Sequence, residues 1–451
     1  MGYVPHTDRE RSEMLAAIGV ERMEDLFAAV PAEVRFPALK LRPPACELDI
    51  AREMQALTAR NHVAEPASSF LGAGVYHHFR PALVDTVISR SEFYTSYTQY
   101  QPEVSQGFLQ ALFEYQSMIC RLTGMEVSNA SHYDGATALA EAVLLALNLA
   151  GGKRRKILLS PAVHPQYRAV VKSYLRGTHA ATIAGDEDGS ADLDRLKDML
   201  DQDTAVLVIQ NPNFFGQCEP VAGLAEAVHL AGALLIVVTD PIALGLFRPP
   251  GAYGADVVVA DGQSLGIAPS FGGPHLGIFA ARMAQVRRLS GHLVGETVDA
   301  DGRRGYVLTL ATREQHIRRA KATSNICTNS ALCALAAATY LATMGKRGLK
   351  HVAELCFHKS HYAAAEINKL KGFAVNPQAP DKPFFKEFVA RLPAPAAQVN
   401  AHLHKEHGII GGYDLGRDDP RLKDHMLVAV TEVNTRASID RLVAALGEVA
   451  K

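Results

Sequence analysis

Between residues 106 and 261, apolar residues follow two alternating spacings that predict alternating helices and strands. The segments 106–124 and 134–150 carry apolar residues at helical spacing, and the second is apolar on nearly every face, so we expect it to be buried. Short apolar runs predict strands at 156–160, 205–210, 233–240 and 256–260, and helical patterns lie between them at 164–175 and 222–232. Because these runs are apolar on both faces, they predict a parallel sheet covered by helices.

The residues before this region predict short helices with little core of their own. Helical stretches at 8–19, 23–30 and 47–61 are interrupted by proline-rich chain. We interpret them as an arm that packs on a larger body or on a partner chain. The domain assignment is therefore an N-terminal helical arm, a large α/β domain and a small C-terminal α+β domain, at residues 1–69, 70–345 and 346–451.

The C-terminal segment predicts a small domain of strands and helices. Strands are expected at 383–391 and 425–432, and helices at 398–408 and 436–449. Asn434 and Thr435 both suit the N-cap of the last helix. Further upstream, Thr312 followed by Gln315 matches a capping box and predicts the start of a long helix.

Composition narrows the classes of partner. The chain has 451 residues, 48% hydrophobic and 21% charged, and its 46 basic and 47 acidic side chains give a net charge of −1. This is typical of a folded protein of several packed units and offers no positive excess to attract nucleic acid or anionic lipid. Six scattered cysteines suggest neither a metal site nor a disulfide framework, and no apolar run reaches the roughly 18 residues of a membrane span. We therefore expect a cytoplasmic protein without metal, nucleic-acid or membrane partners.

Several residues of the α/β region are typical of aminotransferase-like enzymes that use pyridoxal phosphate. Gly135 and Thr137 stand at a helix start, whose backbone amides can hold a phosphate. His164 follows a strand and can stack on a pyridine ring, and Asp240 ends a strand where a carboxylate can pair with the pyridinium nitrogen. Two nucleotide-binding sites are excluded, because the chain has neither a GxxxxGK[ST] motif nor a complete GxGxxG after a strand.

The lysine that such an enzyme needs for its Schiff base is missing from the expected loop. No lysine occurs from Asp198 to Ala320, and Ser264 lies where the lysine is expected, within the glycine-rich loop 262–277. A hydroxyl cannot form an imine, so a self-sufficient pyridoxal enzyme is not expected. We interpret the four residues named above as a relic cofactor cradle, in which Asp240 caps the turn after its strand. The Gly135 turn is then an ordinary helix start. The alternatives are that this turn binds an anion through its free amides, and that His164 and Asp240 still hold a ligand on this chain.

Long segments of the chain resemble the P-protein family of the glycine cleavage system, in the form split into two subunits. They are YTQYQPEVSQGFLQALFEYQ, NASHYDGATALAEA, QNPNFFGQCE, SFGGPHLG and RGYVLTLATREQHIRRAKATSNICTN, and KEFVARL and LVAVTE in the tail are similar too. The resemblance covers nearly the whole chain. One departure lies at Ser290, Gly291 and His292, where the family usually shows a Pro-Gly-Arg-like turn. A role for an arginine at that turn is therefore not expected here.

The resemblance implies a fold, a cofactor and partners. The fold would be aminotransferase-like, fold type I of the pyridoxal-phosphate-dependent transferases. The chain would be subunit 1 of an α2β2 glycine decarboxylase, whose homologous subunit 2 carries the pyridoxal phosphate on its own lysine. Glycine would lose CO2 there, and its aminomethyl group would pass to the lipoyl-bearing H-protein. The absence of the lysine from the loop around Ser264 is expected for such a subunit.

Two groups of residues are candidates for lining the partner's active site. Tyr97 and Tyr100 lie in the segment that resembles the family's YTxYQPE motif, and the alternative is an interface pair with satisfied hydroxyls. Thr323, Ser324 and Asn325 lie in a region from which such dimers donate phosphate ligands to the neighbouring chain, although these residue types also cap helices.

Two rival functions remain open at this point. The first is a catalytically silent scaffold or regulatory homologue of the same fold, which would restore no activity when added to subunit 2. The second is an independent lyase that uses a lysine elsewhere, such as Lys321. Mapping a borohydride-reduced adduct by mass spectrometry would distinguish the second rival from the others.

Overall fold

The computed structural model describes residues 5–61, 63, 65–178, 181–184, 193–322 and 324–449. The chain divides into two compact units at residue 63, and each is described by itself. The first unit contains α1 (Asp8–Ile18), a 3-10 helix (Met23–Phe27) and α2 (Glu47–Thr58). Thr7 caps α1 through the Glu10 backbone N–H, and α1 and α2 bury none of their residues within the unit. The predicted short helices with little core are confirmed.

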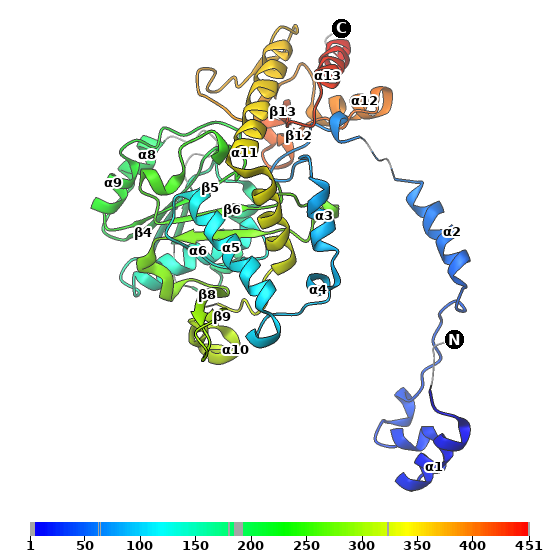
Figure 1. Ribbon diagram of the computed structural model, residues 1–451. Coiled ribbons are helices and arrows are strands. Elements are labelled where there is room, and N and C mark those ends of the chain that lie inside the picture. Colours follow the sequence, from blue (N-terminus) through cyan, green and yellow to red (C-terminus); the bar gives the residue numbers. More distant parts are fainter. Residues whose placement is uncertain are drawn as a thin grey trace. The chain divides into compact units, whose positions relative to one another are not determined.

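The second unit is built on a seven-stranded sheet in the order β1-β7-β6-β5-β4-β2-β3. Its strands are β1 (Val127–Ser128), β2 (Lys156–Leu159), β3 (Ala181–Ala184), β4 (Thr204–Gln210), β5 (Leu234–Thr239), β6 (Val257–Asp261) and β7 (Gly277–Ala281). The strands β2 to β6 run parallel, whereas β7 is antiparallel to both of its neighbours. The four predicted strands are the centre of this sheet, so the mainly parallel arrangement is confirmed (Figure 1).

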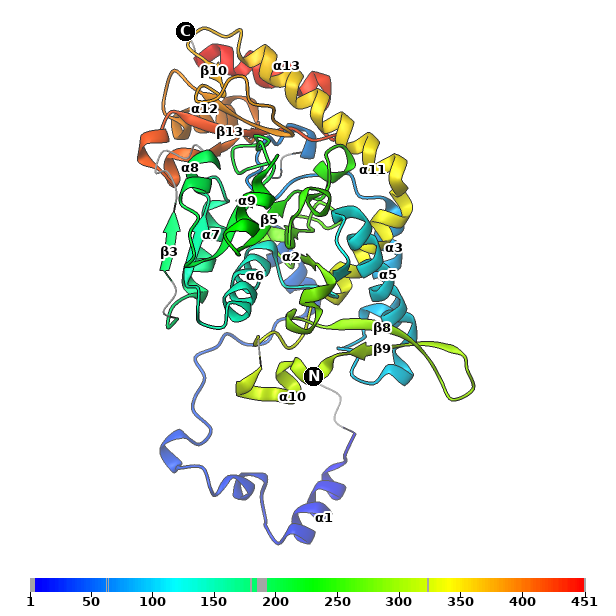
Figure 2. The same cartoon turned by 90° about the vertical axis from the view of Figure 1, so that its left-hand side faces the viewer.

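Helices cover both faces of the sheet. They are α3 (Ala82–Ile88), α4 (Ser91–Tyr94), α5 (Gln106–Thr123), α6 (Gly135–Leu149), α7 (Pro165–Tyr174), α8 (Leu193–Asp198), α9 (Leu224–Leu230) and α11 (Ala331–Ile367). Successive side chains of a strand point to opposite faces. Accordingly, Leu158 packs in a buried cluster with α5 and α11, and its neighbour Ile157 packs in another with α6 and α7. Figure 2 shows α6 and α7 on one side of β5 and α5 and α11 on the other.

A second, antiparallel sheet follows in the order β10-β11-β13-β12. It consists of β10 (Ala374–Val375), β11 (Glu387–Arg391), β12 (Tyr413–Asp414) and β13 (His425–Ala429), with α12 (Ala396–His407) and α13 (Arg436–Val449) packed on it. The predicted elements of this region are confirmed, and Thr435 accepts the capping hydrogen bond from the Ser438 N–H.

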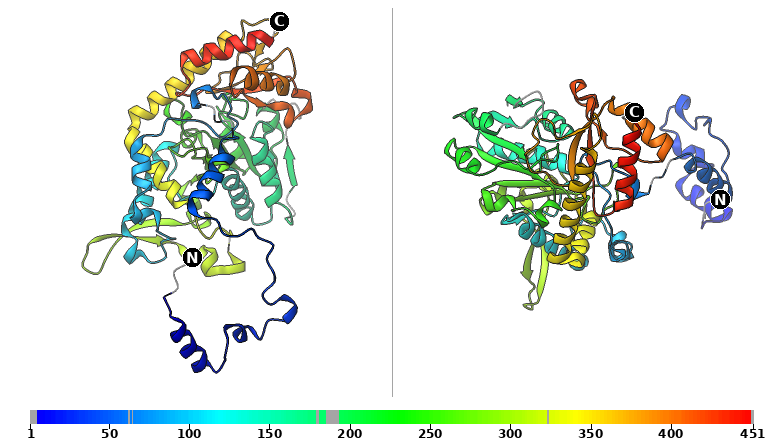
Figure 3. Two further views of the ribbon diagram at one scale, coloured as in Figure 1. Left: turned by 90° about the vertical axis from the view of Figure 1, so that its right-hand side faces the viewer. Right: turned by 90° about the horizontal axis from the view of Figure 1, so that it is seen from above.

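The long helix α11 connects the two sheets. It contacts α3 and α5 near its start and α13 and β11 near its end (Figure 3). Gly345 interrupts its regular geometry with φ 58° and ψ −177°. Placing domain boundaries at residues 69 and 345 remains a prediction. No helix among the described residues is long and apolar enough to cross a membrane.

The segment between β7 and α11 differs from the prediction. It contains a hairpin of β8 (Leu293–Val298) and β9 (Arg304–Thr309), then the four-residue helix α10 (Gln315–Arg318). The capping-box prediction at Thr312 was wrong, because Arg313 is buried and its guanidinium donates to the Leu289 and Gly291 carbonyls. The positive φ of Arg319 then ends the helical geometry, and the long helix begins only at Ala331.

Candidate functional site

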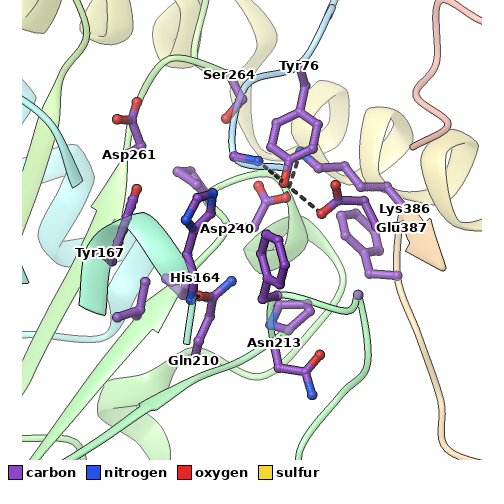
Figure 4. A pocket seen from close by; sticks show the side chains of 18 residues that line it. Tyr76, His164, Tyr167, Gln210, Asn213, Asp240, Asp261, Ser264, Lys386 and Glu387 are labelled. Carbon is purple, nitrogen blue, oxygen red and sulfur yellow. Dashed lines mark hydrogen bonds and ion pairs between the residues drawn. The ribbon is translucent and has the colours of Figure 1, made fainter. Parts of the chain in front are cut away.

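A pocket lies at the carboxyl ends of β4, β5 and β6, where open α/β sheets bind their ligands. Gln210, Asp240 and Asp261 come from these strand ends, while the segments around Tyr76 and Lys386 close the opposite side (Figure 4). The space inside is about 50 Å³, which suffices for a few water molecules. A wider cleft of about 620 Å³ adjoins it and shares His164 and Asp261 with it.

Asp240, the predicted partner of a pyridinium, is bound by a lysine of the same chain. The Nζ atom of Lys386 lies 2.6 Å from Asp240 Oδ2, and the other oxygen, Oδ1, accepts the Ile242 N–H at 2.9 Å. The prediction that Asp240 caps the following turn is therefore confirmed. Both oxygens of its carboxylate are engaged by the chain itself.

Lys386 is surrounded by groups that stabilise a cation. Its side chain is 2% exposed, and Nζ lies 3.4 Å from the centroid of the Tyr76 ring and 3.2 Å from His78 Nε2. His78 in turn pairs through Nδ1 with Glu432 at 2.7 Å. A buried ammonium is tolerated only when it is paired and hydrogen-bonded, and this arrangement provides both.

Glu387, next in the chain, fixes the segment that lies over the pocket. Its carboxylate accepts hydrogen bonds from the Ala73 N–H and the Tyr76 hydroxyl, each at 2.7 Å. Burial raises the pKa of Glu387 to about 7, although these two hydrogen bonds and Lys386 oppose the shift. The Tyr76 ring is thus held in place above the Lys386 ammonium.

Carboxylates also engage the backbone amides at the start of α6. The Thr137 N–H donates to Asp134 Oδ1 at 2.8 Å, in a capping box, and the Gly135 N–H donates to Asp261 Oδ2 at 3.2 Å. The predicted ordinary helix start is confirmed, and its amides already hold carboxylates where a phosphate would have to bind.

Asp261 also holds an imidazole at the edge of the wider cleft. It pairs with His275 Nδ1 at 3.3 Å, and this hydrogen bond raises the pKa of the His275 ring. The burial of His275 works against that rise, but the bond to Asp261 is the larger influence. Asp261 is therefore engaged both by the start of α6 and by the loop that precedes β7.

His164 and Ser264, two further residues named in the sequence analysis, both line the pocket. The Gln166 N–H donates to His164 Nδ1 at 3.1 Å, so the ring proton is on Nε2, which donates to the Ala73 carbonyl at 2.9 Å. Burial lowers the pKa of His164, which favours this neutral form. Ser264 lines the pocket, and its buried hydroxyl has no hydrogen-bond partner in the described part of the chain.

These contacts do not fit pyridoxal phosphate. Asp240, the carboxylate that would pair with the pyridinium nitrogen, is already paired with Lys386. The backbone amides that would bind the phosphate already donate hydrogen bonds to Asp134 and Asp261. The sequence analysis considered a lysine in the loop around Ser264 and, as a rival, Lys321, and it did not identify Lys386. A pattern of one basic residue within an apolar strand, FFKEFVA, was the available signal, because a lysine in such a run needs a buried partner.

The residues predicted to line a partner's site lie away from this pocket. Tyr97 is 77% exposed and borders a separate groove, and the Tyr100 hydroxyl donates to the Cys327 carbonyl at 3.3 Å. Ser324 donates to Glu141 of α6 at 2.8 Å, and Asn325 is exposed. Thr323 lies outside the described residues. Their contact with a neighbouring chain remains a prediction.

The turn at Ser290, Gly291 and His292, where the chain departs from the family pattern, is held by contacts with Arg313 and Glu314. The buried imidazole of His292 lies with its Nδ1 atom against the carboxylate of Glu314. The guanidinium of Arg313 donates to the Gly291 carbonyl at 2.8 Å and to the Leu289 carbonyl at 2.5 Å. An arginine therefore contacts this turn, but it comes from position 313 and holds backbone carbonyls.

Comparisons with known proteins identify the family and the fold. The family model described as glycine cleavage system P-protein matches residues 1–446. A probable glycine dehydrogenase (decarboxylating) subunit 1 from Geobacillus kaustophilus is 53% identical over 448 residues, which cover 99% of this chain and 98% of that one. The protein of the same description from Thermomicrobium roseum is 54% identical over 450 residues, 99% of each chain.

Solved structures support the same family and fold. A crystal structure of glycine decarboxylase (P-protein) of the glycine cleavage system, in inhibitor-bound form, aligns over 100% of both chains with a TM-score of 0.92 and 46% identity. An alanine–glyoxylate aminotransferase from Nostoc aligns over 92% of this chain and 98% of its own with a TM-score of 0.60 and 17% identity. The second likeness shows the fold alone, and the predicted aminotransferase-like fold is confirmed.

Proposed function

The chain belongs to the glycine cleavage system P-protein family, and we propose that it is the subunit of a two-subunit glycine dehydrogenase (decarboxylating) that carries no pyridoxal phosphate. The observation that carries this proposal is the closed cradle: Ser264 replaces the Schiff-base lysine, and Lys386 already occupies the carboxylate of Asp240. Pyridoxal phosphate would be bound by a homologous second subunit. There it supplies the electron sink for the decarboxylation of glycine.

The contribution of this chain would be to complete and shape the partner's active site. Tyr97 is exposed at the rim of a groove that also includes Asn329 and Ser330, and such polar and aromatic groups suit an interface with a second chain. Tyr100 is anchored by its hydroxyl to the Cys327 carbonyl. These residues would position glycine and exclude water at the neighbouring site, together with Thr323, Ser324 and Asn325.

The further partners follow from the reaction of the family. The aminomethyl group of glycine would pass to the lipoyl-lysine of an H-protein, and the assembly would be an α2β2 tetramer of this chain and subunit 2. The six cysteines are all free thiols, which supports a reducing compartment such as the cytoplasm.

Reconstitution with purified subunit 2 tests the proposal. The exchange of bicarbonate carbon with the carboxyl group of glycine is expected only when this chain, subunit 2 and lipoylated H-protein are combined. Each component alone is the control. A mixture that gains nothing from this chain would favour the silent scaffold, and exchange by this chain without subunit 2 would favour the independent lyase.

A further inference from the structure

The Lys386 ammonium is enclosed by a carboxylate and an aromatic ring, which we call the cage. On one side lies the Asp240 carboxylate at 2.6 Å, and on another the face of the Tyr76 ring, with its centroid at 3.4 Å. A carboxylate combined with an aromatic face is the combination by which proteins recognise organic ammonium ions. The two groups are also rigidly held, since Tyr76 donates its hydroxyl to Glu387 and Asp240 accepts the Ile242 N–H.

The two groups of the cage and the lysine that fills it come from distant parts of the chain. Asp240 follows β5 of the large sheet, Lys386 immediately precedes β11 of the C-terminal sheet, and Tyr76 lies in the segment before α3. In Figure 4 the Lys386 side chain runs past the Tyr76 ring toward Asp240. The ammonium thus reaches the carboxyl end of a central strand, the place at which folds of this type bind small molecules.

The charges of the cage depend on one another. The Asp240 side chain is 16% exposed and that of Lys386 is 2% exposed, so removing either charge leaves the other in a poorly solvated position. The neighbouring Glu432 does not replace Asp240, because it is bound to His78. A shortened Lys386 side chain therefore leaves an anionic cavity under an aromatic face.

We propose that Asp240 and the Tyr76 ring form a binding site for organic monocations, that Lys386 is its built-in occupant, and that this occupancy keeps a pyridine-based coenzyme out of this chain. The site would take a primary alkylammonium or a pyridinium ion once Lys386 is shortened. The inference concerns this chain alone, so its test is independent of the reconstituted activity.

Chemical rescue of a K386A variant tests the cage. The variant lacks Cγ to Nζ, a fragment matched by n-propylammonium, and we expect n-propylammonium to raise its melting temperature, whereas the uncharged 1-propanol does not. Wild-type protein, whose cage is filled, should show no such rise. Binding to K386A should be at least roughly tenfold tighter than to D240N/K386A, because the latter lacks the carboxylate. Equal responses of wild type, K386A and D240N/K386A would overturn the proposal.

A second set of variants covers the case in which K386A does not fold. K386M fills the space of lysine without its charge and leaves Asp240 unpaired, whereas D240N/K386M replaces both charges. We expect D240N/K386M to melt at a higher temperature than K386M, and the reverse order would contradict the cage. In wild-type protein, incubation with pyridoxal phosphate and borohydride should leave Lys386 unmodified in peptide maps. A pyridoxyl group on Lys386 would show that the coenzyme enters, and would overturn the proposal.

Discussion

The Tyr76 hydroxyl donates a hydrogen bond of 2.7 Å to the Glu387 carboxylate, and the two side chains join the segment before α3 to the first residue of β11. The carboxyl group of Glu387 is buried, and the Ala73 N–H is its second donor. This contact places a titrating carboxyl beside the Lys386 and Asp240 pair. The stability of the pocket should therefore respond to pH through Glu387.

A Glu387→Gln variant should reveal this response. Burial raises the pKa of Glu387 to about 7 from an ordinary value of 4.5, so between these pH values the unfolded chain has lost a proton that the folded chain retains. Stability from this group is fully present below about pH 4.5 and falls as the pH rises through 7. The glutamine does not titrate, so its free energy of unfolding relative to wild type should rise over this range, by up to about 3 kcal/mol.

Denaturant titrations at several pH values measure this difference, and Glu103→Gln, the same substitution at an exposed position, is the matched control. Curves of wild type and E387Q that stay parallel from pH 4.5 to 7 would show that Glu387 titrates normally.

Two buried serines give opposite expectations when each is changed to alanine. The Ser264 hydroxyl has no hydrogen-bond partner among the described residues, whereas that of Ser290 lies 2.9 Å from His132 Nε2. We expect S264A to be at least as stable as wild type, and S290A to lose about 1 kcal/mol. We also expect S264A to retain full activity with subunit 2, since this chain has no imine to form. A large loss of exchange activity in a folded S264A would show that the hydroxyl acts in the reaction.

The predictable part of the fold followed from local patterns. The runs at 156–160 and 256–260 are apolar on both faces, and only a sheet covered on both sides buries such strands. The hairpin of β8 and β9 was missed because its outer residues, from Glu296 to Val298, are exposed and its pattern is weak. The false capping box at Thr312 met all local criteria, but the burial of Arg313 against distant carbonyls overrides them.

The sequence predicted where the site lies, at a strand end and a helix start, but not which side chains contact each other there. Asp240 and Gly135 were found because their chemistry is tied to a strand end and a helix start. Lys386 lies 146 residues after Asp240 in the sequence, so no local spacing predicts that their side chains meet. The same holds for Asp261, whose bond to the Gly135 N–H depends on how two strands and a helix pack.

Removing the cap of α6 should weaken the chain by a modest, well-defined amount. In the Asp134→Ala variant, the Thr137 N–H loses its acceptor at the start of the helix, and we expect a loss of about 1 kcal/mol in the free energy of unfolding. Asp134→Asn is the matched control, because asparagine caps about as well as aspartate. Chemical denaturation of both variants measures this. An unchanged D134A, or an equal loss in D134N, would argue against the capping role.

A variant of Tyr97, the exposed tyrosine of the YTQYQPE segment, can show whether this residue acts in the partner's active site or in the folding of this chain. Tyr97 is 77% exposed within the isolated chain, so Tyr97→Ala should change the free energy of unfolding by no more than about 0.5 kcal/mol. If Tyr97 reaches the partner's active site as proposed, the same variant should lower the exchange activity of the reconstituted enzyme at least roughly tenfold, a loss of about 1.4 kcal/mol in transition-state stabilisation. Leu230→Ala is the control, because Leu230 is 90% exposed on α9 and outside the groove. A Y97A subunit that binds subunit 2 and retains full exchange would remove Tyr97 from the active site.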